Sequence, residues 1–295
     1  MEKRSMKSAY AYLVPSTIIM TLMLGFPIVY NIIISFTEWT LKSSEKHFNG
    51  IDNYIKVLMD EKFIKILIIT VLWTGINILL QMLIGIGLAL FADHLTKGKK
   101  FMRVILLIPW IIPGTVTALT WKWMLQSDVG IVNYLLMHFN LTGQNILFLS
   151  DQNIALMTLI LVHVWKAFPF WFLMITASLQ NKPVDQIEAA VMDGARYPHI
   201  LRYIILPHLS PIIASTGVLT TIWTLNYFDL IWLMTKGGPM DATSTLPIYT
   251  YRLAFEFNDF GRSAALAVIS LIVVSLVCIP YVRKMFHNMK EEGVL

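Results

Sequence analysis

Long apolar runs alternate with short polar segments along the whole chain. Most runs reach or exceed the roughly 20 apolar residues that an α-helix needs to cross a bilayer core. The predicted spans are about residues 10–36, 66–92, 101–125, 154–180, 205–234 and 263–286. This pattern predicts an all-α integral membrane protein with about six transmembrane helices, built as one transmembrane domain over residues 1–295.

The overall composition supports a membrane class. The chain is 56% hydrophobic and 14% charged, whereas a soluble domain carries nearer a quarter charged residues. Its mean hydropathy is +0.64. We therefore expect a multi-pass protein whose main solvent is the lipid bilayer.

Basic residues predict the orientation of the spans, because cytoplasmic loops are enriched in Lys and Arg. The segment at 126–153 has neither residue type. Basic residues gather before the first span, between the second and third, after the fourth and at the C-terminus: Lys3, Arg4, Lys7, Lys97, Lys99, Lys100, Arg103, Lys182, Arg196, Arg202, Arg283, Lys284 and Lys290. We predict that both termini and the loop at about 181–205 are cytoplasmic. The net charge of +5 follows from this bias and does not indicate nucleic-acid binding.

The loop at about 181–205 has the features of a short helix that leaves the membrane and returns to it. Asn181 can cap a helix, Pro183 is tolerated in a first turn, and Gly194 suits a left-handed helix end. One apolar stripe is expected from the helical spacing of Val184, Ile187 and Val191. The spacing alone is also compatible with an ordinary amphipathic loop helix.

The motif inside this loop is more specific than its helical pattern. It reads E-A-A-x-x-D-G-A, formed by Glu188, Ala189, Ala190, Asp193, Gly194 and Ala195. This segment resembles the EAA loop of binding-protein-dependent ABC importers, the coupling helix that seats in a groove of the ATPase subunit. The resemblance implies the type I ABC importer permease fold. It also implies that Glu188 pairs with a basic residue of the ATPase and that Gly194 sets the docking turn.

Catalytic and nucleotide-binding motifs are missing from the sequence. There is no GxxxxGK[ST] phosphate loop, no HExxH, no CxxC and no GxSxG. The sequence therefore predicts a transport subunit without a catalytic site, a metal site or a cofactor of its own. ATP and Mg are expected on a partner ATPase.

Ionisable residues inside the predicted spans form a second signal, because such residues are costly in lipid and face protein or water. Among them are His163 and Lys166 near the middle of the fourth span and Asp229 in the fifth. His163, Lys166 and Phe170 share one helix face, and so do Thr220, Trp223, Thr224 and Tyr227. Hydroxyls, a cation and aromatic rings suit a sugar, which presents hydroxyls and apolar C–H faces. The alternative is internal packing, with Lys166 or His163 paired to Asp229.

The resemblance extends from about residue 15 to residue 284. Its strings are FPIVYNIIISFTEW, NGIDNYIKVLMDEKF, RVILLIPWIIPGTVTALTWKWML, VWKAFPFWFLMITASLQ and LNYFDLIWLMTKGGPMDATSTLPIYTYRLAF. They are similar to carbohydrate-type ABC permeases, in particular the first permease of maltose-type transporters. That family implies a second homologous permease, two ATPase subunits and an extracytoplasmic solute-binding protein, in the cell membrane of a prokaryote.

The same resemblance implies a substrate path for a sugar or oligosaccharide near the middle of the bilayer. By matching strings, its residues are Trp110, Gly114, Lys166, Phe170, Thr220, Trp223, Thr224 and Tyr227. Two alternatives stay open. One is glycerol 3-phosphate or another polyol carried by the same machinery. The other is an ion-coupled secondary transporter that uses His163, Lys166 and Asp229 as a relay.

Overall fold

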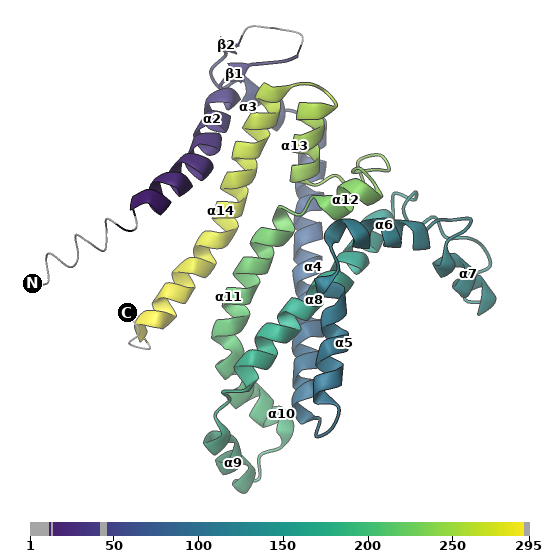
Figure 1. Cartoon of the computed structure of the whole chain (residues 1–295), viewed down its shortest axis with the longest axis vertical. Coiled ribbons are helices and arrows are strands. Elements are labelled where there is room, and N and C mark those ends of the chain that lie inside the picture. The colour runs from purple at the N-terminus through teal and green to yellow at the C-terminus, as the bar shows by residue number, and fades with distance from the viewer. Residues whose placement is uncertain (1–11, 13, 42–45, 292–295) are drawn as a thin grey trace, which may run out of the picture. The chain divides into compact units, whose positions relative to one another are not determined.

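The computed structural model describes residues 12, 14–41 and 46–291, and within these the side chains except those of 280–282 and 284–291. The first residues of the predicted span 10–36 and the basic residues Lys3, Arg4 and Lys7 lie outside this description. The described chain is mostly helical and has one small antiparallel ribbon among its described residues (Figure 1). Its elements are η1 Thr21–Gly25, α2 Phe26–Ser35, β1 Thr37–Glu38, β2 His47–Phe48, α3 Asp52–Leu58, α4 Glu61–His94, α5 Lys99–Ile111, α6 Gly114–Met124, α7 Ile131–His138, α8 Ala155–Leu179, α9 Val184–Met192, α10 Tyr197–Ile200, η2 Leu201–Ile205, α11 Leu206–Leu225, α12 Asp229–Met234, α13 Leu246–Phe255 and α14 Phe260–Glu291.

Five helical stretches in the described residues are long and apolar enough to cross a membrane, and a bent pair of helices makes a sixth candidate. The five are Val14–Ser35, Glu61–His94, Ala155–Leu179, Tyr197–Met234 and Phe260–Ile279. The predicted multi-pass α-helical class is confirmed.

The third predicted span, 101–125, is not one straight helix. The structure divides it into α5 and α6, which meet at an angle of 90°. Ile112 at the junction has extended dihedrals (φ −63°, ψ 130°), because the ring of Pro113 disfavours a helical conformation in the residue before it. The proline converts a predicted span into a broken one and leaves the Ile112 carbonyl outside both helices.

The fifth predicted span, 205–234, is also interrupted. Helix α11 ends at Leu225 and α12 begins at Asp229, with Asn226–Phe228 between them. A π-helical turn, η2, precedes α11, whose second residue is Pro207. Both interruptions belong to the part of the chain that carries the predicted substrate residues.

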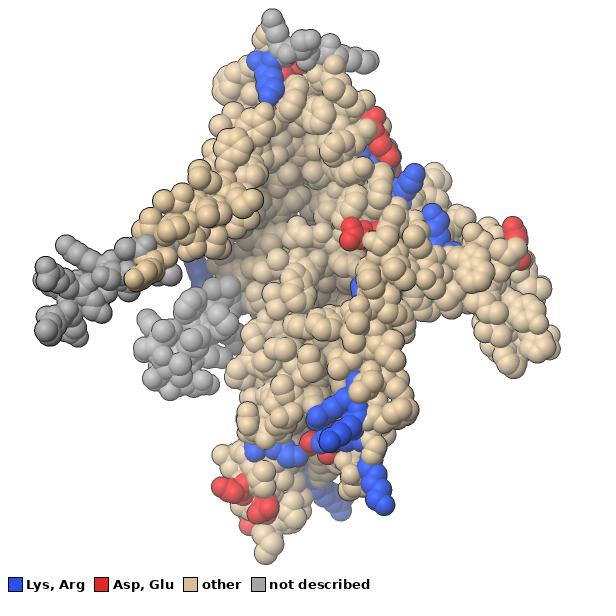
Figure 2. All heavy atoms as spheres, viewed as in Figure 1, with Lys and Arg blue, Asp and Glu red and all other residues tan. Residues whose placement is uncertain are grey.

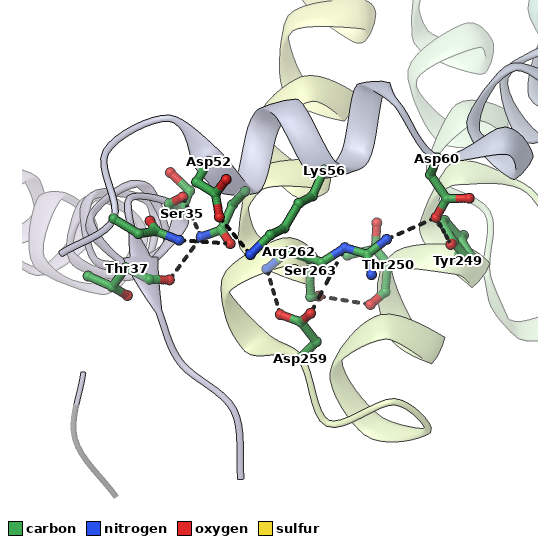
Figure 3. A network of polar contacts seen from close by, with 12 residues as sticks. Ser35, Thr37, Asp52, Lys56, Asp60, Tyr249, Thr250, Asp259, Arg262 and Ser263 are labelled. Carbon is green, nitrogen blue, oxygen red and sulfur yellow. Dashed lines mark hydrogen bonds and ion pairs between the residues drawn. The ribbon is translucent and has the colours of Figure 1, made fainter. Parts of the chain in front are cut away.

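The contacts within the described residues divide the chain into two compact units. The first unit contains residues 1–64 and 249–272. A network of polar contacts joins its helices α3, α13 and α14 (Figure 3). Asn53 donates to the carbonyls of Ser35 and Thr37 at 3.0 and 2.8 Å. Asp60 accepts hydrogen bonds from Tyr249 (2.6 Å) and Arg262 (2.9 Å).

The second unit, residues 65–248 and 273–295, holds the predicted site residues. Its packing depends on a close approach between α4 and α8 at Gly85. A Cβ added there would overlap the Cβ of Trp171 and lie 3.0 Å from the backbone nitrogen of Phe172. Trp171 and Phe172 are almost fully buried. Gly85 therefore sets the distance between two helices that both contribute to the site described below.

Gly85→Ala is expected to destabilise the purified chain by about 1–3 kcal/mol, because the added methyl overpacks the α4–α8 contact. Thermal unfolding in one detergent, followed by Trp fluorescence, measures the change. Gly87→Ala is the matched control on the same helix, since nothing lies within 4 Å of a Cβ there. Equal unfolding midpoints for the two variants would contradict the packing argument.

The Asp60 network gives a prediction about pH. Burial by itself would raise the pKa of the Asp60 carboxyl, but hydrogen bonds from Tyr249, the Lys62 backbone and Arg262 outweigh burial and leave this pKa lowered. The ionised carboxylate therefore stabilises the unit above its ordinary pKa, and this contribution is lost as the pH falls through the lowered value. Tyr249→Phe should raise the pKa of Asp60 toward its ordinary value. A ¹³C titration of the Asp carboxyls, assigned with Asp60→Asn, checks this, and an unshifted titration would refute it.

Candidate functional site

A cavity of about 440 Å³ lies in the second unit. Its walls come from α4, α5, α8, α11 and the residues that follow α11. The lining residues are Gln81, Trp110, His163, Lys166, Ala167, Phe170, Thr220, Ile222, Trp223, Thr224, Asn226 and Tyr227. Seven of the eight predicted substrate-path residues are among them, so the structure brings these side chains together.

Aromatic rings form one wall of the cavity. The ring centroids of Trp110 and Phe170 are 6.0 Å apart, and those of Phe170 and Trp223 are 5.1 Å apart. Trp110 and Trp223 are 43% and 48% exposed. Their rings are therefore accessible to a ligand and are not buried in a packed core. This is the arrangement of rings that stacks on apolar ligand faces.

Lys166 brings a positive charge to the cavity. Its Nζ donates to the carbonyl of Ile112 at 2.5 Å, the carbonyl that the α5–α6 break leaves without a helical partner. Among the described residues, no ion pair joins Lys166 or His163 to Asp229, so the internal pairing considered from the sequence is not formed. Within that described part, the charge of Lys166 has no carboxylate partner.

The buried partners of His163, which are Asn77 and Gln81, were not predicted from the sequence. His163 Nδ1 lies 2.8 Å from Asn77 Oδ1, and Gln81 Nε2 is 3.5 Å from the same oxygen. Since an amide oxygen accepts, the Nδ1–H of His163 donates to it. Asn77 and Gln81 are spaced i, i+4 within the apolar run of α4, and that spacing was the signal that could have identified them.

Tyr227 lines the cavity although it lies beyond the end of α11, so helical spacing does not explain its position. The predicted shared face of Thr220, Trp223, Thr224 and Tyr227 assumed one helix, but α11 ends at Leu225. The helix break places Tyr227 against His163, with ring centroids 4.3 Å apart.

Gly114 is the predicted path residue outside the cavity lining. A Cβ at Gly114 would lie 3.4 Å from the Tyr227 hydroxyl and 3.9 Å from both Asp229 Oδ2 and Lys166 Cε. It therefore lies next to the cavity residues, and a larger side chain there would press on Tyr227.

The predicted loop helix is present as α9, and its C-terminal end has the predicted geometry. Gly194 has φ +84°, the left-handed conformation that favours glycine. The N–H of Ala195 bonds to Ala190 O at 2.9 Å, and the N–H of Gly194 bonds to Val191 O at 3.0 Å. This pair of bonds is a Schellman motif.

One detail of the loop prediction was wrong. Helix α9 has Pro183 as its N-terminal cap without a side-chain hydrogen bond, so Asn181 does not cap it. The apolar stripe of Val184, Ile187 and Val191 lies on one continuous helix and is only partly covered. Ile187 packs on the core of the second unit, whereas Val184 and Val191 are 49% and 55% exposed.

The motif residues divide in the same way. Ala190 packs on that core. Glu188, Ala189 and Asp193 are exposed, and so is Gly194. An exposed surface with apolar, acidic and small residues is therefore available for contact with another protein. That these residues contact an ATPase stays a prediction.

Comparison with known proteins places these features in a family. The family described as "Binding-protein-dependent transport system inner membrane component" matches residues 81–288. A probable ABC transporter permease protein, y4oQ, of Sinorhizobium fredii is 34% identical over 279 residues, which cover 94% of this chain and 89% of that protein. The trehalose/maltose transport system permease protein MalF of Thermococcus litoralis is 29% identical over 95% of this chain and 94% of its own length.

The fold is also similar to a solved structure. A chain of a bacterial ABC transporter involved in the import of the acidic polysaccharide alginate superposes with a TM-score of 0.84. The match covers 97% of both chains at 22% identity, which supports the fold alone. The chain therefore belongs to the binding-protein-dependent transport system inner membrane component family, the multi-pass permease subunits of prokaryotic ABC importers.

Proposed function

We propose that this permease carries a sugar or oligosaccharide through the cavity formed by Trp110, Lys166, Phe170, Trp223 and Tyr227. The observation that supports this most is the union of exposed aromatic faces with polar groups in one cavity. A sugar ring offers apolar C–H faces to the aromatic rings and hydroxyls to Lys166, the threonines and the amides. The similarity to a trehalose/maltose permease supports the same substrate class.

A charged carbohydrate or polyol is the second candidate. Lys166 faces a neutral carbonyl, Ile112 O, so an anionic group would find a cation there in surroundings of low dielectric. The similar fold of an alginate importer is compatible with an acidic sugar. Glycerol 3-phosphate carries the same kind of charge and belongs to this candidate class.

The proposed machinery includes four further proteins. A second homologous permease completes the path, two ATPase subunits bind ATP and Mg, and an extracytoplasmic solute-binding protein delivers the substrate. Membership of the ABC permease family supports this arrangement over an ion-coupled secondary transporter. In this proposal Glu188, Ala189, Ala190, Asp193 and Gly194 form the coupling surface for an ATPase, and α9 lies on the cytoplasmic side.

Trp223→Ala is expected to reduce substrate uptake at least about tenfold, since stacked aromatic contacts with a ligand contribute on the order of 1–3 kcal/mol each. Uptake by the assembled complex in proteoliposomes measures the effect. Trp123→Ala is the control, because Trp123 is 63% exposed and lies outside the cavity lining. Wild-type uptake by a fully assembled Trp223→Ala complex would refute the proposed path.

Lys166→Met tests the charge of the substrate. For an anionic substrate, uptake should fall sharply and lose its dependence on ionic strength, because the methionine keeps the volume without the charge. For a neutral sugar, the reduction should be small. Comparing a neutral and an acidic oligosaccharide of equal length in one assay separates the two candidates.

Gly194→Asp is expected to abolish transport while the chain stays in the membrane. The positive φ of Gly194 is strained for any residue with a Cβ, and the added charge lies on the proposed docking surface. Gly143→Asp is the control, since Gly143 has an ordinary φ and nothing within 4 Å of a Cβ. Co-purification of the ATPase and uptake measure the result, and normal values for both would overturn the coupling role of α9.

A further inference from the structure

The C-terminal end of α4 holds the start of the coupling loop, defined here as residues 181–205. The Asp93 carboxylate receives the Lys182 ammonium on Oδ2 and the Lys99 ammonium on Oδ1, the latter at 3.3 Å. Lys182 immediately precedes Pro183, the N-terminal cap of α9, and Lys99 is the first residue of α5. One carboxylate thus joins α4, α5 and the coupling loop.

The same end of α4 also holds the returning arm of the coupling loop. The rings of His94 and Tyr197 meet edge to face, with centroids 4.8 Å apart and planes at 82°. The Nδ1–H of His94 donates to Leu90 O at 2.8 Å, which fixes the orientation of the ring. Tyr197 is the first residue of α10. Adjacent residues of α4 therefore contact the chain on both sides of α9.

Apolar packing reinforces these polar contacts. Ala89 and Ala92 of α4 are fully buried in a cluster with Ile175 and Leu179 of α8. Ile187, Ala190 and Ala195 of the coupling loop pack on this cluster. The coupling loop therefore packs on a core to which both α4 and α8 contribute.

Charged side chains gather at the end of the second unit that carries the coupling loop, and the side chains around Asp93 are only partly exposed to solvent. Figure 2 shows Lys and Arg side chains gathered at the end of the second unit that carries α9 and α10. The side chains of Asp93, Lys99 and Lys182 are only 20%, 32% and 30% exposed. Partly buried ion pairs are screened less by salt than fully exposed ones, and removal of Asp93 would leave two ammonium groups facing each other.

We propose that Asp93 is a positioning residue for transport, which locks the α4–α5 turn to the coupling loop so that they move as one body. This inference rests on the proposed coupling role of α9. Covalent continuity connects α9 only to α8 and α10, whereas the Asp93 contacts add α4 and α5. Displacement of α9 by an ATPase would then reach α4 directly.

Helix α4 connects the contacts of Asp93 with Lys99 and Lys182, here called the lock, to the cavity. Gln81, which lines the cavity, is twelve residues before Asp93, which is about 18 Å along a helix. Asn77, one turn further, accepts the hydrogen bond from His163. A shift of α4 relative to α8 would therefore alter the contacts of His163 with its buried partners. The lock supplies a route by which ATP hydrolysis acts on the shape of the substrate site.

The test uses the reconstituted full transporter and measures substrate moved per ATP hydrolysed. Asp93→Asn and Lys182→Gln should each lower this ratio about fivefold or more, the scale of a typical coupling between sites. The double variant should be no worse than Asp93→Asn, since Asp93→Asn already removes the contact that Lys182→Gln removes. A merely structural role would reduce the amount of complex, or both rates together, and leave the ratio unchanged.

Two further variants sharpen the comparison. Lys97→Gln removes a positive charge from the same turn, and Lys97 is exposed, so its ratio should equal that of the wild type. Asp93→Glu keeps a carboxylate that faces both Lys99 and Lys182, so it should retain most of the ratio that Asp93→Asn loses. A ratio within twofold of wild type for both single variants, additive losses in the double variant, or a loss in Asp93→Glu as large as in Asp93→Asn would overturn the proposal.

The failure of this inference can be distinguished from failure of the proposed function. If Gly194→Asp transports normally, the coupling role of α9 is wrong and the Asp93 proposal falls with it. If Gly194→Asp blocks transport while Asp93→Asn keeps the wild-type ratio, only the lock is refuted. If neither single variant assembles but Asp93→Glu does, Asp93 serves assembly, and the proposal is overturned.

Discussion

A chain in hydrocarbon must satisfy every backbone polar group inside the protein, and this requirement organises the second unit. The helices are interrupted at Ile112–Pro113 and at Asn226–Phe228. Irregular backbone is tolerated at membrane depth only where protein or a water-filled cavity surrounds it. Both interruptions adjoin the cavity, and the carbonyl released at Ile112 accepts the Lys166 ammonium. The lysine thus supports the broken helix and charges the proposed substrate path.

Packing between α4 and α8 connects this cavity to the opposite end of the second unit. At Gly85 the two helices are closer than any side chain on α4 would allow. On one side of that contact, Asn77 and Gln81 meet His163. On the other side, Ala89 and Ala92 pack against α8 and support the coupling loop. A close-packed interior transmits displacement because it has little free volume to absorb it, so α4 has the structure expected of a mechanical link.

Much of this was predictable from the sequence. Apolar run length predicted the multi-pass class, the E-A-A-x-x-D-G-A string predicted the family, and Gly194 predicted the left-handed end of α9. Local rules suffice for such features, since span length, turn chemistry and motif spacing depend on residues near one another in the chain. The Asn181 cap was wrong, since Pro183 occupies that position, and the bend within the third span was not predicted.

The sequence by itself determined that this chain lies in a membrane, that it belongs with ABC permeases and which side chains are costly in lipid. It did not determine their partners. Pairing of Lys166 or His163 with Asp229 was one alternative, yet a backbone carbonyl accepts the hydrogen bond from Lys166. Asp93 was only an acidic residue in a basic turn, until folding brought Lys182 to it across 89 positions. Such pairings were decided by the tertiary structure, because helix breaks and helix packing fix which distant groups meet.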